Sequence, residues 1–138
     1  MLKHKMFQPY MECARAFAKL SKAERLKVGG IAVTPNDIVI YSWNGTASGD
    51  DNVCEEAGVT KKEVLHCEAN IVGKAAREGH SLKGSNVFVT ASPCLDCAKL
   101  LKQAGVAGVY YDDEYRLTDG IDYLRQRGVH CERYEEDQ

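Results

Sequence analysis

Two short motifs place metal-ligating side chains at the starts of two predicted helices. His66 and Glu68 open an Ala-rich helical segment, and Cys94 and Cys97 stand at the start of a second one. His66, Cys94 and Cys97 can bind one metal ion only if the two helix starts meet above a common sheet. This requirement constrains the fold more strongly than any other feature of the chain.

The ligand types in these motifs favour zinc. Two thiolates and one imidazole are typical zinc ligands, and a site with three protein ligands keeps its fourth position for water, as catalytic zinc sites do. Zinc makes such a water acidic enough to give hydroxide near neutral pH. Glu68 lies two residues after His66 in the first helical turn, where it can reach the fourth position without binding the metal. We interpret Glu68 as a proton carrier.

A structural zinc is the alternative interpretation of the same motifs. It requires a fourth protein ligand, for which the sequence offers Cys54, Cys67, His80, His130 and Cys131. A Cys-x-x-Cys pair alone does not distinguish structural, redox and catalytic roles. The combination of His-x-Glu with Pro-Cys-x-x-Cys in a strand–helix context is much more specific and favours catalysis.

Length and composition predict one domain over residues 1–138 and exclude some partners. The 138 residues carry 18 Lys and Arg against 20 Asp and Glu, a formal net charge of -2. This balance argues against non-specific nucleic-acid binding, which needs a basic face. No apolar run reaches the roughly 20 residues that a membrane helix needs. The N-terminal residues lack a secretory pattern, so we expect a cytoplasmic location with the cysteines as free thiols or metal ligands.

The order of predicted elements indicates an α/β fold. We expect helices over 6–23, 66–78, 95–103 and 118–127, and strands over 28–33, 38–43, 86–91, 106–111 and 129–134, with a polar loop over 44–59. The first two strands form a hairpin, and the later strands alternate with helices, which implies parallel pairs. The prediction is a three-layer α/β/α structure with a mixed five-stranded sheet.

Four segments carry a resemblance to a known family. They are Arg25-Leu26-Lys27-Val28-Gly29, Trp43-Asn44-Gly45-Thr46, His66-Cys67-Glu68-Ala69-Asn70 and Ser92-Pro93-Cys94-Leu95-Asp96-Cys97-Ala98-Lys99. With them the chain resembles deoxycytidylate (dCMP) deaminases of the compact phage and bacterial type, in the cytidine deaminase-like superfamily. The chemistry of the metal motifs agrees, because His-x-Glu with Pro-Cys-x-x-Cys is the signature of zinc-dependent nucleobase deaminases.

The resemblance implies a reaction and a site. dCMP would be hydrolysed to dUMP and ammonia, which supplies dUMP for dTMP synthesis. One zinc ion would be held by His66, Cys94 and Cys97, and Glu68 would carry protons to N3 and to the leaving amine. The implied substrate contacts are Asn44 to the 3′-hydroxyl, Arg25 and Arg116 to the 5′-phosphate, Tyr115 over the base, and Ser92 to the base through its backbone.

The resemblance also implies regulation and assembly. Many family members are homo-hexamers that dCTP activates and dTTP inhibits, with Mg²⁺ accompanying the triphosphate. The corresponding regulatory residues here are Gly45, Ser48, Gly49, Asp50 and Arg77. Val64 stands where some members have a histidine for a second zinc, so we expect one zinc per chain. If the protein is phage-encoded, its location is the host cytoplasm.

Two other function classes remain open from the sequence. A related deaminase could act on tRNA adenosine, free cytosine or guanine, although the net charge offers a tRNA little attraction and a free base needs neither Arg25 nor Asn44. A zinc-stabilised binding module without enzymatic activity would need a fourth protein ligand. The residues Cys13, Cys54, Cys67 and Cys131 have no assigned role.

Overall fold

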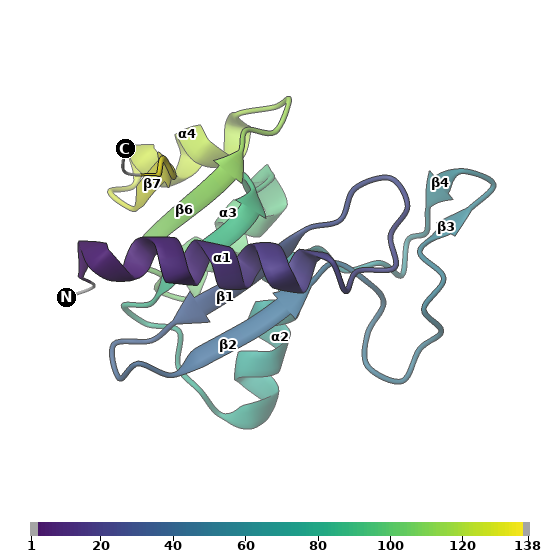
Figure 1. The fold of residues 1–138 in the computed structure, drawn as a ribbon, viewed down its shortest axis with the longest axis horizontal. Coiled ribbons are helices and arrows are strands. Elements are labelled where there is room, and N and C mark those ends of the chain that lie inside the picture. The colour runs from purple at the N-terminus through teal and green to yellow at the C-terminus, as the bar shows by residue number, and fades with distance from the viewer. Residues whose placement is uncertain (1–2, 137–138) are drawn as a thin grey trace.

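The computed structural model describes residues 3–136, and within them the chain forms a mixed five-stranded sheet (Figure 1). The strand order is β2-β1-β5-β6-β7; β2, β1 and β5 are antiparallel neighbours, whereas β5, β6 and β7 are parallel. The strands are β1 (Gly29–Val33), β2 (Val39–Trp43), β5 (Asn86–Ala91), β6 (Gly108–Asp113) and β7 (His130–Arg133). The helices are α1 (Phe7–Ala18), which follows the 3-10 turn η1 (His4–Met6), and α2 (Cys67–Glu78), α3 (Leu95–Gln103) and α4 (Asp119–Gln126).

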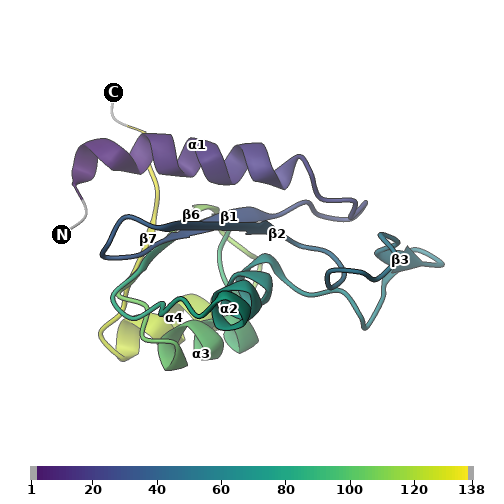
Figure 2. The same cartoon turned by 90° about the horizontal axis from the view of Figure 1, so that it is seen from below.

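Helices cover both faces of the sheet. Helix α1 lies alone on one face, and α2, α3 and α4 lie on the other (Figure 2). The strand period of two separates the two cores, because Ile31 and Val33 of β1 pack in the cluster under α1 whereas Ala32 packs in the cluster under α2. The predicted three-layer α/β/α architecture is confirmed. The predicted single domain also includes positions 1–2 and 137–138, which lie outside the described residues.

Helix α1 approaches the sheet very closely at β1. A Cβ atom on Gly29 would lie 2.3 Å from the carbonyl oxygen of Ala14 and 2.2 Å from the backbone nitrogen of Ala18. No side chain fits in this space, so only glycine allows α1 to pack at this distance. The contact fixes the distance between α1 and the sheet. It therefore also fixes the position at which the segment after α1 begins its path toward the site.

The first helix is shorter than predicted. We expected it to extend to Ala23, but α1 ends at Ala18. Tertiary hydrogen bonds take over from the helix: the Ser21 hydroxyl donates to the carbonyl oxygen of Asn44 at 2.9 Å, and the Val28 N–H donates to the Asn44 side-chain oxygen at 2.9 Å. The segment after α1 is therefore a loop held against the end of β2.

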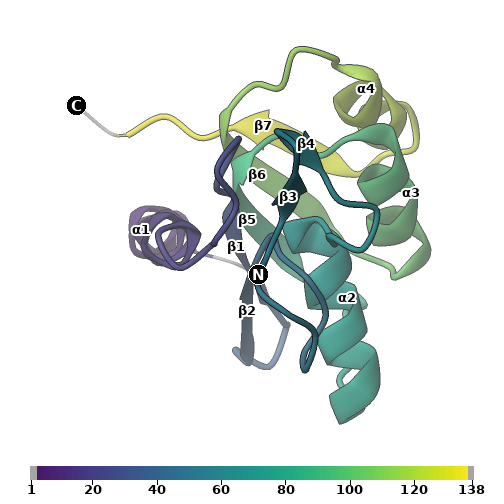
Figure 3. The same ribbon diagram turned by 90° about the vertical axis from the view of Figure 1, so that its right-hand side faces the viewer.

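The segment 44–59 was predicted as a loop, but it contains all of a small hairpin except its last residue, Thr60. Strands β3 (Glu55–Glu56) and β4 (Val59–Thr60) pair antiparallel across a tight turn at Ala57 and Gly58, whose φ angles are 53° and 79°. Two consecutive positive φ angles are typical of hairpin turns of the primed types. The hairpin stands out from one end of the sheet, at the right of Figure 1 and nearest the viewer in Figure 3.

The remaining boundaries follow the prediction with small shifts. The strand expected over 106–111 is displaced by two residues, to Gly108–Asp113. The Val106 N–H donates back to Leu101 at the end of α3, and the Ala107 N–H donates to Ser85 before β5. Helix α4 spans Asp119–Gln126 and the last strand His130–Arg133. None of the helices within the described residues is long and apolar enough to cross a membrane.

Candidate active site

The three predicted metal ligands come together where two helices begin. His66 and Cys94 are the residues that immediately precede α2 and α3, and both have extended backbone conformations. Cys97 lies in the first turn of α3. The Nδ1 atom of His66 is 3.5 Å from the Sγ atom of Cys94 and 3.5 Å from that of Cys97. The helix starts thus meet as the motifs required.

This arrangement fits a zinc ion. The three ligand atoms all lie within 4.8 Å of one another. In a tetrahedral zinc site the bonds are about 2.0 Å to nitrogen and about 2.3 Å to sulfur, so a nitrogen ligand and a sulfur ligand lie about 3.5 Å apart. The His66 Nδ1 atom has this separation from each of the two sulfur atoms. The Nδ1 atom of His66 is the ring nitrogen beside the two sulfurs and would be the imidazole ligand. No fourth histidine, cysteine or carboxylate within residues 3–136 joins this group, so a fourth position stays open for water.

The charges of the ligand groups also suit a cation. The pKa of Cys94 is lowered to about 4, because its thiolate accepts hydrogen bonds from Cys97 and His66. The pKa of His66 is raised by its bond to Cys94. The pKa of Cys97 is raised, because its thiol donates to the neighbouring thiolate and is buried. A divalent cation removes this competition between the two sulfurs and allows both to bind as thiolates.

The Glu68 carboxyl group is buried beside the ligands. The residue is only 4% exposed, and its desolvation raises the pKa of the carboxyl group to about 7. The other carboxyl group in the two motifs, that of Asp96, is exposed instead and pairs with Lys99 at 3.2 Å. The Glu68 carboxyl group forms no salt bridge among residues 3–136. Burial without one is costly for a carboxylate, and such groups cluster at functional sites.

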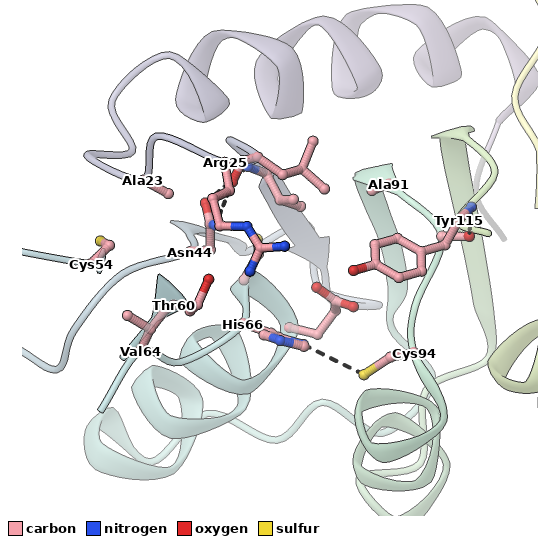
Figure 4. A pocket seen from close by; sticks show the side chains of 15 residues that line it. Ala23, Arg25, Asn44, Cys54, Thr60, Val64, His66, Ala91, Cys94 and Tyr115 are labelled. Atoms are coloured by element: carbon pink, nitrogen blue, oxygen red, sulfur yellow. Dashed lines mark hydrogen bonds between the residues drawn. The ribbon is translucent and has the colours of Figure 1, made fainter. Parts of the chain in front are cut away.

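A cavity of about 250 Å³ opens above the ligands (Figure 4). Arg25 and Tyr115 extend into it from opposite sides, and His66 and Cys94 form its floor. Its lining comes from six parts of the chain: the loop after α1, the end of β2, the β3–β4 hairpin, the start of α2 with the residues before it, the end of β5 with the residues that follow, and the loop after β6.

The structure places Asn44 in the cavity wall with much of its amide group already engaged. Its Oδ1 atom accepts the Val28 N–H at 2.9 Å, and its Nδ2 atom donates to the Leu26 carbonyl oxygen at 2.8 Å. An amide has two donor hydrogens and two acceptor lone pairs, so one of each remains. Asn44 therefore supports the loop that carries Arg25 and can still offer one donor and one acceptor to a ligand.

Ser92, Tyr115 and Arg116 occupy three different situations. Ser92 is buried in the cavity wall, and Tyr115 is 45% exposed at the cavity mouth. Arg116 does not line this cavity; it lines an adjoining hollow that shares Arg25 and Tyr115 with it. Arg25 and Arg116 thus lie on a continuous path from the cavity to its outer rim.

Residues 5–112 match the family described as the cytidine and deoxycytidylate deaminase zinc-binding region. The chain belongs to this family. The match covers both metal motifs and most of the sheet, and it confirms the resemblance and the enzyme class predicted from the sequence.

Individual relatives of this deaminase support the same family assignment. The dCMP deaminase of cyanophage S-TIM5, solved in complex with dCMP and dUMP, is 45% identical with a TM-score of 0.91, over 97% of this chain and 100% of that one. The deoxycytidylate deaminase of Enterobacteria phage T4 is 41% identical over 72 residues, 51% of this chain and 37% of that protein. ComE operon protein 2 of Bacillus subtilis is 28% identical over 136 residues, 95% of this chain and 72% of that protein.

The five residues predicted for regulation all line a second hollow in the deaminase. Its volume is about 440 Å³, and its lining includes Gly45, Ser48, Gly49, Asp50 and Arg77. The two hollows lie on opposite sides of the same backbone: Asn44, Val64 and His66 face the first, whereas Gly45 and Leu65 face the second. Gly45 and Leu65 are joined by two backbone hydrogen bonds of 3.0 and 2.8 Å, which form the wall between the hollows.

Sequence reasoning missed part of the cavity lining. Cys54 and Thr60 reach it from the β3–β4 hairpin, and Ala23 reaches it from the loop after α1. The one local signal was Ala57-Gly58, which favours a tight turn and hence a hairpin around it. Of the cysteines without a predicted role, Cys54 and Cys67 line the cavity, whereas Cys13 is exposed and Cys131 lies in the core.

Proposed function

We propose that this protein hydrolyses dCMP to dUMP and ammonia. The observation that carries the proposal is the buried Glu68 carboxyl group beside a three-ligand cluster at the floor of a cavity that Arg25 enters from its rim. A structural zinc site needs neither the buried carboxyl group nor the cavity. The solved relative that binds dCMP and dUMP supports the same substrate and product for this chain.

Glu68 is the proton carrier of the proposed reaction. When zinc is bound by His66, Cys94 and Cys97, it supplies a water acidic enough to act as the nucleophile at C4 of cytosine. The Glu68 carboxyl group accepts the first proton that this water loses and gives it to N3. It then takes the second proton from the hydroxyl group now on C4 and gives it to the amine, which leaves as ammonia while C4 keeps the oxygen as the carbonyl group of dUMP. Its burial excludes bulk water, so that the proton moves between Glu68 and the substrate.

The remaining proposed contacts are those that a deoxynucleotide would make. Arg25 binds the 5′-phosphate, with Arg116 farther out along the adjoining hollow, because a guanidinium group can donate to two phosphate oxygens at once. Asn44 uses its remaining amide capacity for the 3′-hydroxyl. Tyr115 covers the base. The Ser92 N–H already donates to the Asp113 carbonyl oxygen at 2.9 Å, so its backbone contact to the base comes from its carbonyl group.

Ammonia release from dCMP, deoxycytidine, cytosine and dCTP tests the substrate. We expect kcat/KM for dCMP to exceed that for deoxycytidine by about 100-fold, the size of two charge-assisted hydrogen bonds. Arg25→Gln should remove most of this preference. Lys22→Gln is the matched control, because Lys22 is an exposed cation three residues away that does not line the cavity. Equal turnover of the nucleoside and the nucleotide would refute the phosphate contacts.

We further propose that dCTP activates and dTTP inhibits the enzyme by binding, with Mg²⁺, in the hollow lined by Gly45, Ser48, Gly49, Asp50 and Arg77. The shared wall supports this proposal, since a nucleotide that moves the Gly45–Leu65 pair must also move Asn44 and His66, which are their neighbours in sequence. Arg77 in the last turn of α2 and His66 at its start are connected by one rigid helix.

The regulatory proposal is tested by the ratio of dCMP turnover with and without each triphosphate. We expect activation by dCTP and inhibition by dTTP in the native protein, and a ratio near one for both in Arg77→Gln. Lys102→Gln, an exposed cation near the end of α3, should retain the native ratios. Absence of any response in the native protein would refute regulation while leaving the proposed reaction intact.

The resemblance supports two further proposals, a homo-hexamer and a location in the cytoplasm, which is the host cytoplasm for a phage-encoded protein. Light scattering after size-exclusion chromatography measures the assembly. A stable monomer at enzyme concentrations of about 1 mg/mL, well above those of an activity assay, would contradict the hexamer.

A further inference from the structure

Ser92 joins the metal-ligand segment to the loop that carries Tyr115. Ser92 lies between the end of β5 and the ligand Cys94 and is only 4% exposed. Its backbone N–H donates to the Asp113 carbonyl oxygen at 2.9 Å. Its hydroxyl oxygen accepts the backbone N–H of Tyr115 at 2.6 Å. The side chain therefore acts on a neighbouring loop rather than standing free in the cavity wall.

The same loop is attached to the metal-ligand segment at its other end. Gly120, in the first turn of α4, packs on the backbone of Pro93 and Cys94, where an added Cβ atom would lie 2.1 Å from the Pro93 carbonyl oxygen. Residues 114–118 thus span two fixed points, both on the segment 92–94. Between these points, the hydrogen bond to Ser92 is the only one that Tyr115 makes among the described residues.

The exposure of Tyr115 makes this bond important. The side chain is 45% exposed, so packing alone does little to hold its ring in the cavity mouth. Figure 4 shows the ring extending from the loop toward the centre of the cavity. The direction of the ring therefore depends on the position of the backbone at residue 115, and the Ser92 hydroxyl is the group that holds that backbone.

We propose that Ser92 is a positioning residue, whose hydroxyl group holds the Tyr115 backbone so that the tyrosine ring covers the substrate in the cavity. The inference rests on the proposed function for its catalytic consequence, because Tyr115 matters only if a base lies beneath it. It differs from a direct contact between the Ser92 side chain and the substrate. Loss of the hydroxyl should loosen the ring and weaken binding, while Glu68 and the metal ligands keep their places.

Hydrogen exchange of the Tyr115 amide tests the bond without any substrate. We expect Ser92→Ala to accelerate this exchange at least tenfold, and Ser92→Thr, which keeps the hydroxyl, to preserve most of the protection. Ser85→Ala is the matched control, because Ser85 is a fully buried serine just before β5 whose hydroxyl has no partner among the described residues. Unchanged exchange in folded Ser92→Ala would overturn the proposal whatever the substrate proves to be.

A double-mutant cycle with dCMP tests the consequence. We expect Ser92→Ala to raise KM about tenfold with kcat changed less than threefold, and Ser85→Ala to change neither. In a Tyr115→Ala background the same serine substitution should change KM less than twofold, because the ring that it positions is gone. A tenfold effect that persists there would show direct substrate contact and overturn the proposal. Failure of the native protein to deaminate dCMP would instead refute the proposed function.

Discussion

The side chain of Glu55 in the β3–β4 hairpin accepts the backbone N–H of Glu24 at 2.6 Å through one carboxylate oxygen and at 3.2 Å through the other. Glu24 immediately precedes Arg25, which extends into the cavity. The hairpin is therefore more than one wall of the cavity. It also holds the loop that carries the proposed phosphate ligand.

Substitution of Glu55 should weaken phosphate binding through this loop. We expect Glu55→Ala to raise KM for dCMP about fivefold with little change in kcat, since an exposed charge-assisted bond contributes modestly. Glu55→Gln retains an acceptor oxygen, so its KM should fall between those of Glu55→Ala and the native protein. Glu56→Ala, at the adjacent exposed carboxylate of the same strand, is the matched control. If Glu56→Ala had the same effect as Glu55→Ala, general hairpin disruption would be the better explanation.

Glu68→Gln should retain zinc and lose turnover. The amide has nearly the same shape, but it cannot accept and return a proton, so kcat should fall by about 10³-fold. Ammonia release and zinc content are measured on the same preparation. Asp96→Asn is the control, because Asp96 lies inside the second motif yet is exposed and paired with Lys99. Activity near the native level in Glu68→Gln would exclude the proton-carrier role.

Removal of one sulfur ligand should remove the metal. We expect Cys97→Ser to bind well below one zinc per chain and to be inactive, because a hydroxyl group is a much weaker zinc ligand than a thiolate. Cys13→Ser changes an exposed thiol without a site role and should keep about one zinc per chain. A chelator should inactivate the native protein, and added zinc should restore it. Full zinc content in Cys97→Ser would contradict the ligand assignment.

The ion-pair group around Arg15 should stabilise the fold. Its guanidinium group donates twice to Asp112, at 2.7 Å each, and once to Glu136 at 2.8 Å, so that it joins α1 to β6 and to the segment after β7. These bonds raise the pKa of Arg15 above its ordinary value. We expect Arg15→Gln to lower the free energy of unfolding by about 1 kcal/mol, since the group is only partly buried.

That loss corresponds to a decrease in Tm of about 2–5 °C, and it should shrink as salt is added. Lys62→Gln, at an exposed position without an ion pair among the described residues, should leave Tm unchanged. Equal shifts in the two variants would show that net charge, rather than the Arg15 contacts, determines the stability.

The cluster of His66, Cys94 and Cys97 was predictable because the signal of each motif is local. His66 and Glu68 are two residues apart, Cys94 and Cys97 are three apart, and each pair stands where a strand or loop becomes a helix. Spacing within a helical turn determines which side chains of each pair can converge, and the predicted order of strands and helices brings the two pairs together across 28 to 31 residues. The strand and helix order followed from periodicity in the same way, and most element boundaries agreed within one or two residues.

The structural role of the Asn44 side chain, which holds the loop that carries Arg25, was not predictable. The sequence places it beside Gly45 in a turn, but the structure engages its amide with Leu26 and Val28, which lie 18 and 16 residues earlier. The premature end of α1 has the same origin. Helical propensity continues past Ala18, yet hydrogen bonds from Ser21 and Val28 to Asn44 outweigh it, because they form only when β2 lies beside the loop.

The sequence by itself predicted the chemistry of the site: three candidate zinc ligands, one carboxyl group near them, and the order of elements that brings two helix starts together. Only the tertiary structure decided how the substrate cavity is enclosed. It placed the β3–β4 hairpin against the Arg25 loop, set Arg116 in an adjoining hollow, and bound Ser92 to Tyr115. The signal of each ligand pair is contained in one helical turn, and the order of elements supplies the meeting of the two helix starts. The enclosing contacts have no such local signal, because they join irregular segments 23 to 31 residues apart through hydrogen bonds to backbone N–H groups.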